Sequence, residues 1–323
     1  TTGNAAAATS APGKPRALVT GASSGIGWAC AEALRDAGFE VIGTSRKGAG
    51  AAHPDGIEMV ALDMGDPASI AEVAESVVAG GAPAVVVANA GESQSGPFEE
   101  LPADALNRVF QVNVLGQVDL VQRLLPSMRE AGAGRVVLVG SMLGGLPLPH
   151  RSSYVATKAA LRGFGLSLRG EVSRFGIGVT VVEPGSINTG ISTRRTKYGA
   201  AEGSPYRDDA LTMVSNLDAN EAKGSSAAEV AETVMAEIAT DRPLPLVARG
   251  SKAGLVVPLG AVIEPFFRGS FRLPDLLPWP TRMAAFLSGV VLIAFGVVLA
   301  VKVLGLCSRT TEPSGGGSAS GTP

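Results

Sequence analysis

The sequence is poor in cysteine, in aromatic residues and in charge. Of its 323 residues only two are cysteines, Cys30 and Cys307, and they lie far apart, without the close spacing of thiols that bind a metal. Such sparse thiols fit a reducing compartment, and we expect Cys30 to pack inside a helix. Charged residues make up 17% of the chain and the formal net charge is −2, so there is no basic excess to attract a nucleic acid. We therefore expect no metal and no nucleic-acid partner.

The first residues also lack the apolar core of a secretory signal. Residues 1–14 are small and polar and are broken by Gly and Pro, and we expect them to form a disordered lead. No repeat with the period of a solenoid follows them, so an array of small repeats is excluded.

What the sequence does contain is an alternation of short apolar runs and helix-length segments. Strands are expected at 16–21, 39–45, 57–64, 84–91, 134–141 and 178–185, and helices at 28–38, 67–81, 102–130, 152–174 and 227–240. Continuous apolar strands separated by helices are typical of a parallel sheet covered on both faces. The sequence therefore predicts one α/β domain, a doubly wound parallel sheet of the Rossmann type, over residues 15–250.

This alternation weakens between residues 186 and 226. The segment is long and polar and shows only a weak helical pattern at its centre. Because a loop of this length inside a compact domain is usually functional, we expect it to close over a substrate as a lid.

A glycine-rich turn, TGASSGIG, joins the first strand to the first helix. Gly21 allows a tight turn, Gly25 lets the backbone approach a pyrophosphate, and Gly27 lets helix and strand pack closely. The free N–H groups of the following helix would then face the anion. We expect a dinucleotide to bind at this turn.

The end of the second strand bears on which dinucleotide is bound. A carboxylate there would accept a hydrogen bond from the ribose 2′-hydroxyl of NAD, whereas a cation would bind the 2′-phosphate of NADP. The sequence supplies Arg46 and Lys47 and no acid. NADP(H) is therefore the expected cofactor, and the alternative is that both cations are only solvated at the surface.

Tyr154 and Lys158 are four residues apart in an expected helix, so they lie on one face, a turn from each other. Alone, this spacing fits a buried aromatic beside a solvated lysine as well as it fits a catalytic pair. Other motifs decide between the two.

Several motifs, in order, resemble those of the short-chain dehydrogenase/reductase family, and together they cover about residues 14–240. They are TGASSGIG, Asp63 in ALDM, ANAG at 88–91, Asn113 in FQVNVLG, Ser141 in VGSM, YVATK, and EPGSINT at 183–189. One departure is Ala88, which stands where the family usually has Asn. The stretch from the serine to the tyrosine resembles 17β-hydroxysteroid and photoreceptor-type retinol dehydrogenases.

The resemblance implies a catalytic set. Tyr154 would be the general acid/base, and Lys158 would favour its phenolate form and hold the nicotinamide ribose. Ser141 would hydrogen-bond the substrate oxygen. Asn113 would hold a water that links Lys158 to solvent.

Cofactor and substrate contacts are implied in the same way. The expected cofactor contacts are Gly21, Ser23, Ser24, Gly25, Ile26, Gly27, Arg46, Lys47, Asp63, Met64, Asn89, Ala90, Gly91, Tyr154, Lys158, Pro184, Gly185, Ile187 and Thr189. The expected substrate contacts are Ser141, Leu143, Leu146, Leu148 and His150, with His150 equally compatible with a solvent-facing loop position.

An apolar run at 283–306 holds one charge, Lys302, and its uncharged part is as long as the roughly 20 residues that a membrane-spanning helix needs. We expect a single-pass C-terminal anchor there, an interfacial linker at 251–282 and a disordered tail at 307–323. The arginines before the run favour a catalytic domain that faces the cytoplasm. A buried core helix or an oligomer contact is the alternative.

These features predict a membrane-bound, NADPH-dependent oxidoreductase. It would interconvert a ketone and a secondary alcohol, or an aldehyde and an alcohol, on a lipophilic substrate such as a steroid or retinoid. One alternative is a reductase of a lipid-biosynthesis intermediate, such as a 3-keto sphingoid base or a β-ketoacyl chain. Another is a membrane-tethered NADP-binding scaffold without turnover. A homodimer or a homotetramer is compatible with either kind of enzyme.

Overall fold

The computed structural model describes residues 13–250, with the exceptions of residues 52 and 200. The expected linker, membrane segment and tail (251–282, 283–306 and 307–323) lie outside the described residues, as does nearly all of the expected lead. Within the described part of the chain, no helix has both the length and the apolar character that crossing a membrane requires.

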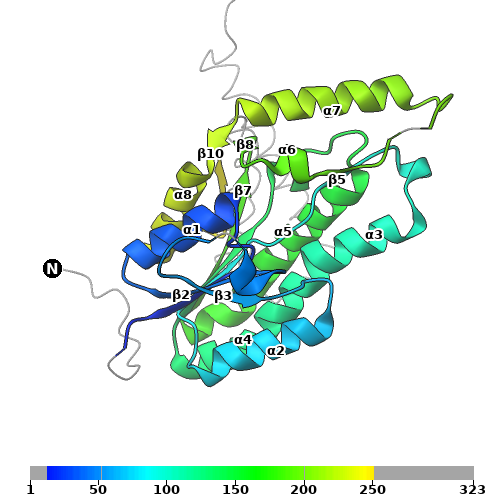
Figure 1. The fold of residues 1–323 in the computed structure, drawn as a ribbon. Coiled ribbons are helices and arrows are strands. Elements are labelled where there is room, and N and C mark those ends of the chain that lie inside the picture. Colours follow the sequence, from blue (N-terminus) through cyan, green and yellow to red (C-terminus); the bar gives the residue numbers. More distant parts are fainter. Residues whose placement is uncertain (1–12, 52, 200, 251–323) are drawn as a thin grey trace, which may run out of the picture. The chain divides into compact units, whose positions relative to one another are not determined.

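Seven strands form a parallel sheet in the order β11-β7-β6-β4-β1-β2-β3 (Figure 1). They are β1 (Arg16–Val19), β2 (Glu40–Ser45), β3 (Glu58–Ala61), β4 (Val85–Ala88), β6 (Gly134–Val139), β7 (Ile177–Pro184) and β11 (Leu246–Arg249). The chain runs outward from β1 to β3 and then returns to β4 on the other side of β1. In such a sheet this reversal leaves a crevice at the carboxyl ends of β1 and β4, where ligands bind.

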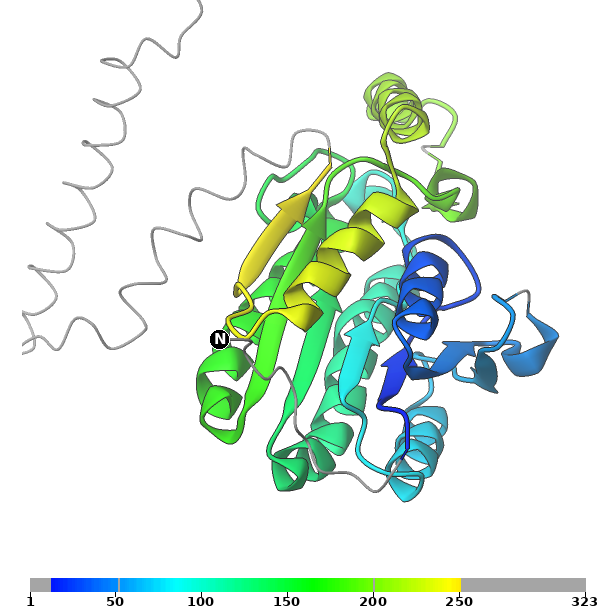
Figure 2. The ribbon, with the colours of Figure 1, turned by 90° about the vertical axis from the view of Figure 1, so that its left-hand side faces the viewer.

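Helices cover both faces of the sheet (Figures 1 and 2). The helices α1 (Gly25–Asp36) and α8 (Ala227–Ala239) pack on one face, and α2 (Pro67–Ala79), α4 (Gly116–Ala131) and α5 (Ser152–Val172) pack on the other. Successive strand residues serve opposite faces, because side chains alternate along a strand. In β1, for example, Leu18 belongs to the core under α2, α4 and α5, and Val19 to the core under α1 and α8. The expected Rossmann-like fold is confirmed.

The long helix expected at 102–130 is interrupted. It consists of α3 (Ala103–Phe110), a π-helical turn (Gln111–Leu115) and then α4. A π turn places one extra residue in a helix, and such turns occur frequently at functional sites. Short 3₁₀ turns are found at Gly48–Gly50, Phe98–Glu100, Met142–Gly144 and Ser173–Phe175.

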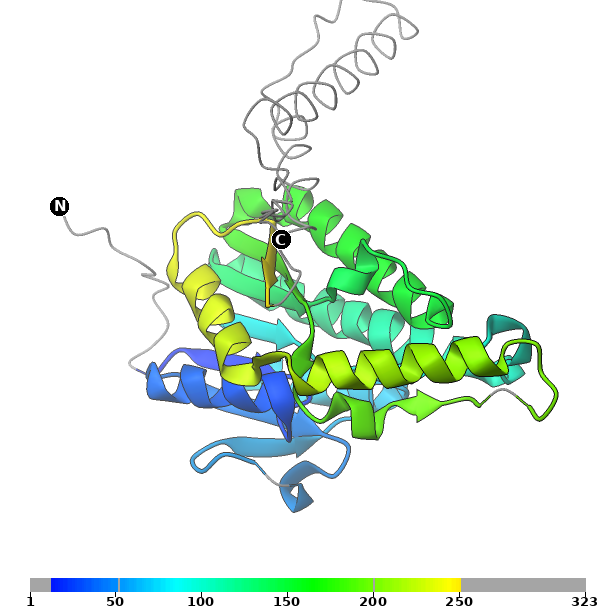
Figure 3. The same ribbon diagram turned by 90° about the horizontal axis from the view of Figure 1, so that it is seen from above.

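The segment at 186–226 is more ordered than a loop. It contains β8 (Ile187–Asn188), α6 (Ile191–Arg194), β9 (Thr196–Lys197), α7 (Arg207–Ala222) and β10 (Ser225–Ser226). The strand β9 pairs with β5 (Gln94–Ser95), and β10 pairs with β8. Figure 3 shows α7 as a long helix beside α6 and β9.

Candidate active site

The glycine-rich turn lies at the carboxyl end of β1. Gly21 and Gly25 have φ angles of 69° and 58°, in the left-handed region that favours glycine. Gly27 is restricted by space instead, because a Cβ there would lie 2.3 Å from the carbonyl oxygen of Gly21 and 2.5 Å from Nδ2 of Asn89. The turn and the first turn of α1 therefore pack without room for a side chain.

Thr20 and Asn89 fasten this turn to the end of β4. The hydroxyl of Thr20 accepts hydrogen bonds from the backbone N–H groups of Asn89 and Ala90, both at 2.9 Å. The side-chain amide of Asn89 donates to the carbonyl of Thr20 at 3.0 Å. The sequence prediction missed Thr20, although a polar residue at the end of a buried strand, just before the glycine turn, was an available signal.

A cavity of about 650 Å³ opens over this turn. Most of the expected adenosine and pyrophosphate contacts line it: Gly21, Ser23, Ser24, Gly25, Ile26, Arg46, Asp63, Met64, Asn89, Ala90, Gly91 and Thr189. Gly27 and Lys47 line neither this cavity nor the one beside it. Lys47 is exposed, and its backbone N–H donates to the hydroxyl of Ser45 at 3.3 Å.

An acid that the sequence prediction did not consider lies near Arg46. The guanidinium of Arg46, whose side chain is 68% exposed, is 3.7 Å from the carboxylate of Glu92. Glu92 in turn accepts two hydrogen bonds from Arg108, at 2.9 and 2.7 Å, and these bonds raise the pKa of Arg108. Because Arg108 neutralises Glu92, the charge of Arg46 stays available to an anion.

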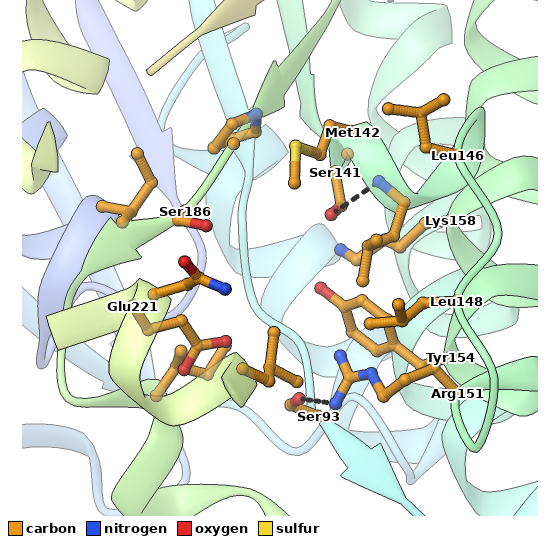
Figure 4. Close-up of a pocket in the computed structure, with 18 of the residues that line it drawn as sticks. Ser93, Ser141, Met142, Leu146, Leu148, Arg151, Tyr154, Lys158, Ser186 and Glu221 are labelled. Carbon is orange, nitrogen blue, oxygen red and sulfur yellow. Dashed lines mark hydrogen bonds between the residues drawn. The ribbon is translucent and has the colours of Figure 1, made fainter. Parts of the chain in front are cut away.

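A second cavity, of about 620 Å³, adjoins the first and contains the expected catalytic pair (Figure 4). Tyr154 and Lys158 lie on α5, are 8% and 6% exposed, and both line this cavity. The ammonium of Lys158 donates to the carbonyl of Val139 at 3.0 Å and lies 5.8 Å from the centre of the Tyr154 ring. Ser141, at the end of β6, lines the same cavity, and its hydroxyl accepts from the N–H of Leu143 at 3.2 Å. The residues that line both cavities are Ile26, Asn89, Gly91, Glu92, Ser93, Thr189 and Ile191.

Asn113 lies in the π turn and is fully buried. Its amide group donates to the carbonyl of Glu92 at 2.9 Å and to the hydroxyl of Thr157 at 3.2 Å. The hydroxyl of Thr157 donates to the carbonyl of Tyr154 at 2.7 Å. Asn113 thus connects the loop after β4 with the helix that carries Tyr154, a structural role that the sequence prediction did not anticipate.

Apolar side chains of the loop before α5 face the same cavity. The expected contacts Leu143, Leu146, Leu148 and His150 all line it, as do Pro184, Gly185 and Ile187 from the end of β7. His150 has a φ of 58°, and its ring meets that of Tyr206 edge-on at 6.4 Å. From the expected lid, α7 contributes Thr212, Met213, Asn216 and Leu217 to the opposite wall.

Two buried arginines near this cavity were missed by the sequence prediction. Arg195 forms ion pairs with both Asp218 and Glu221 of α7. Burial disfavours the charge of Asp218, but hydrogen bonds from Lys197 and Arg195 outweigh it and lower the pKa of this carboxyl. At Glu221 burial outweighs the attraction of Arg195 and raises the pKa. The other arginine, Arg151, lies beneath Tyr154 and is 2% exposed.

No group of His, Cys, Asp and Glu side chains that could hold a metal ion occurs between residues 13 and 250 as the structure describes them. The polar groups of the two cavities are instead hydroxyls, amides, a tyrosine and charged side chains that surround glycine backbone. Space that a Cβ would fill at Gly25, 3.0 Å from the side chain of Thr189, suits an anion held by backbone N–H groups. The two adjoining cavities therefore fit an extended dinucleotide with a substrate beside its far end.

The chain resembles known proteins in sequence and in fold. The family model described as short chain dehydrogenase matches residues 15–198. Dehydrogenase/reductase SDR family member 7B of Mus musculus is 35% identical over 230 residues, which are 67% of this chain and 68% of that protein. The 3-ketodihydrosphingosine reductase of Bacteroides thetaiotaomicron is 28% identical over 228 residues, 70% of this chain and 84% of that one. The solved structure of a short-chain dehydrogenase from Streptomyces avermitilis matches with a TM-score of 0.67 at 35% identity, covering 79% of this chain and 97% of that chain.

Proposed function

The chain belongs to the short-chain dehydrogenase family, and on that premise we propose that it is an NADP(H)-dependent oxidoreductase that interconverts a carbonyl and an alcohol on a lipophilic substrate. The observation that supports this most directly is the meeting of Ser141, Tyr154 and Lys158 at one cavity, beside the cavity over the glycine turn. A scaffold without turnover would have no need for this proton-transfer set.

In the proposed reduction, a bound NADPH supplies the hydride. The hydroxyl of Tyr154 donates its proton to the substrate oxygen and becomes a phenolate, so the new O–H bond of the alcohol forms at the expense of the phenol O–H bond. The hydroxyl of Ser141 donates a hydrogen bond to the same oxygen and stabilises its developing charge. Lys158, held by the carbonyl of Val139, keeps a cation near the ring and favours the phenolate.

The proposed preference for NADP(H) rests on Arg46. Its guanidinium lies at the edge of the first cavity, at the end of β2, where a ribose 2′-phosphate would lie. Planar guanidinium groups bind phosphate through two parallel hydrogen bonds, which suits this position.

The proposed substrate class rests on the lining of the second cavity. Leu143, Leu146, Leu148 and Met213 surround the catalytic groups with apolar side chains. A lipophilic ketone or alcohol, such as a steroid or retinoid, would bury its apolar body there. A second candidate is a 3-keto sphingoid base, favoured by the similarity to the reductase from Bacteroides thetaiotaomicron.

A membrane tether is part of the proposal and rests on the sequence of residues 283–306 alone. The uncharged part of this segment, residues 283–301, is long enough to insert into a bilayer and would hold the catalytic domain near membrane-dissolved substrate. Arg268, Arg272 and Arg282 favour a cytoplasmic position for that domain. Full-length protein should stay with the membrane fraction in alkaline carbonate, and its recovery in the supernatant would contradict the tether.

The activity is tested with purified full-length protein in detergent, by following NADPH absorbance with steroid, retinoid and keto-lipid panels. Tyr154→Phe should retain NADPH binding and lose activity by roughly 10²–10⁴-fold, because it lacks the general acid. Tyr206→Phe, which also removes one tyrosine hydroxyl but lines neither cavity, is the matched control. Substantial turnover by Tyr154→Phe would exclude the mechanism.

A further inference from the structure

Arg151 is a buried cation without a carboxylate partner in the described part of the chain. It is 2% exposed and forms no ion pair with a described acid. Its Nη1 atom donates to the hydroxyl of Ser93 at 3.0 Å, and its Nε atom is buried without an acceptor. The buried Arg195 and the half-buried Arg162, by contrast, each bind at least one carboxylate.

This position is unfavourable for an arginine in two respects. An unpaired buried charge is costly, and burial lowers the pKa of Arg151 to about 10. Arg151 is also the residue that precedes α5, where it caps nothing with its side chain and where the helix dipole disfavours a positive charge. Stability alone therefore does not explain the residue.

What Arg151 does contact is the ring of Tyr154. Its Cζ atom lies 4.2 Å from the ring centre, while the ammonium of Lys158 lies 5.8 Å from it. Arg151 directly precedes α5, three residues before Tyr154, and Tyr154 and Lys158 lie one turn apart on one face of that helix. Figure 4 shows Lys158 on one side of the Tyr154 ring and Arg151 on the other.

The acids nearest to Arg151 are already engaged. Ser93 accepts hydrogen bonds from both Arg151 and Arg195, at 3.0 and 3.3 Å, and so brings the two guanidinium groups together. Arg195 then binds Asp218 and Glu221 of α7, and Lys197 also pairs with Asp218. Lys158 of α5 and the side chains of His150, Glu92 and Asp209 line the same cavity as Tyr154. Glu221 and Asp218 attract Arg151 through space, but neither forms an ion pair with it, because both are already paired with Arg195.

We propose that Arg151 is a positioning residue for Tyr154: it holds the ring in place, and its charge acts together with that of Lys158 to favour the phenolate. This inference rests on the proposed role of Tyr154 as the general acid. A cation over an aromatic face binds it more strongly when water is excluded, which fixes the ring. The same cation stabilises the negative charge that the ring carries once the proton has moved to the substrate.

The composition of the chain allows a direct test, because it contains only three tyrosines, Tyr154, Tyr198 and Tyr206. In the Tyr198→Phe/Tyr206→Phe background, tyrosinate absorbance reports the ionisation of Tyr154 alone, without substrate or cofactor. Arg151→Met in this background should move the titration midpoint up by about one pH unit or more, which would correspond to a roughly tenfold smaller phenolate fraction below the midpoint. Arg151→Lys keeps the positive charge, so its titration midpoint should lie between those of the background protein and Arg151→Met.

Two further measurements separate this effect from a general loss of structure. Arg174→Met removes another arginine that lies over an aromatic ring, 4.6 Å from Phe175 and outside both cavities, and it should leave the midpoint unchanged. The thermal midpoint of Arg151→Met should be retained or raised, because a buried unpaired charge is removed. An unchanged Tyr154 midpoint in Arg151→Met would overturn the inference while leaving the proposed function in place. Turnover by Tyr154→Phe would overturn the function itself and the inference with it.

Discussion

Asn113 and Glu92 are joined by two hydrogen bonds, with the Glu92 N–H donating to Oδ1 of Asn113 at 2.7 Å and Nδ2 of Asn113 donating to the Glu92 carbonyl at 2.9 Å. The side-chain amide of Asn113 thus satisfies both backbone groups of Glu92, as a paired strand would, and fixes the backbone after β4. That backbone borders both cavities, so the pair sets the shape of the place where cofactor and substrate would meet.

Asn113→Ala should therefore lower both stability and cofactor affinity. It leaves the half-buried N–H and carbonyl of Glu92 without their side-chain partner, at a cost of about 1 kcal/mol for each hydrogen bond. Thermal unfolding and NADPH titration measure the two effects. Asn107→Ala, at an exposed position on α3, serves as the control. A loss in Asn113→Ala no larger than in the control would show that the two hydrogen bonds do not fix this backbone.

Gly27→Ala should damage the glycine turn. The added methyl group would lie 2.3 Å from the carbonyl oxygen of Gly21 and 2.5 Å from Nδ2 of Asn89, so the turn must shift away from any bound pyrophosphate. Gly163→Ala on α5, where a Cβ meets no atom within 4 Å, is the matched control and should be stabilising by up to about 1 kcal/mol. Calorimetry with NADPH would record the difference, and equal affinity in the two variants would contradict the close packing at Gly27.

Arg46→Asp should reverse the preference between cofactors. Loss of a charge-assisted hydrogen bond costs about 1.5–3 kcal/mol, so the ratio of NADPH to NADH affinity should fall by roughly tenfold to 150-fold. Lys47→Asp makes the same charge change one residue later, outside the cavity lining, and should alter the ratio much less. If wild-type protein binds NADH as tightly as NADPH, the assignment of Arg46 to the 2′-phosphate is wrong.

Cys30 should be unreactive until the protein unfolds. It is fully buried in the core under α1 and α8, and burial raises the pKa of its thiol from 9.0 to about 12. In a Cys307→Ser background, iodoacetamide near neutral pH should label Cys30 in urea but not in buffer, as mass spectrometry would show. Labelling at equal rates in both conditions would place the thiol at the surface.

The same thiol gives a dependence of stability on pH with a definite sign. Because the folded protein holds this proton more tightly than the unfolded chain does, the contribution of the thiol is intact below about pH 9 and is lost as the pH rises toward 12. The difference in unfolding free energy between the protein and its Cys30→Ala variant should shrink over that range. A difference that grows with pH would contradict the raised pKa.

The sequence predicted well those helices that bury one apolar face against the sheet and those strands that are buried on both faces. Continuous valine-rich runs such as Val85–Ala88 have no other stable place than the middle of a covered parallel sheet. The catalytic set of Asn113, Ser141, Tyr154 and Lys158 was predicted because its motifs resemble those of a family, and the structure brings the last three of these residues to one cavity.

The features that the sequence did not predict are mostly those held by contacts with residues far away along the chain. The helix α7 has only Ala210 fully buried, and it is held by Arg195 instead of by an apolar stripe, so its amphipathic signal is weak. The position of Arg151 depends on Ser93, which is 58 residues away along the chain. The π turn could not be read from the sequence, because Gln111–Leu115 contains no Gly or Pro that would mark a break in the helix.

Because of that π turn, the orientation of α3 relative to α4 depends on the number of residues between them. One residue of an α-helix corresponds to a rotation of about 100° around the helix axis. Deleting Leu115 would let the turn close into regular α-helix, and circular dichroism would register almost no change. Yet the deletion would rotate everything before it: Asp104 and Arg108 would turn away from the cavity they now border, and Asn113 would lose its hydrogen bond with Glu92. In this helix, therefore, an insertion or deletion of a single residue is a more severe change than most substitutions, because it alters register and not composition.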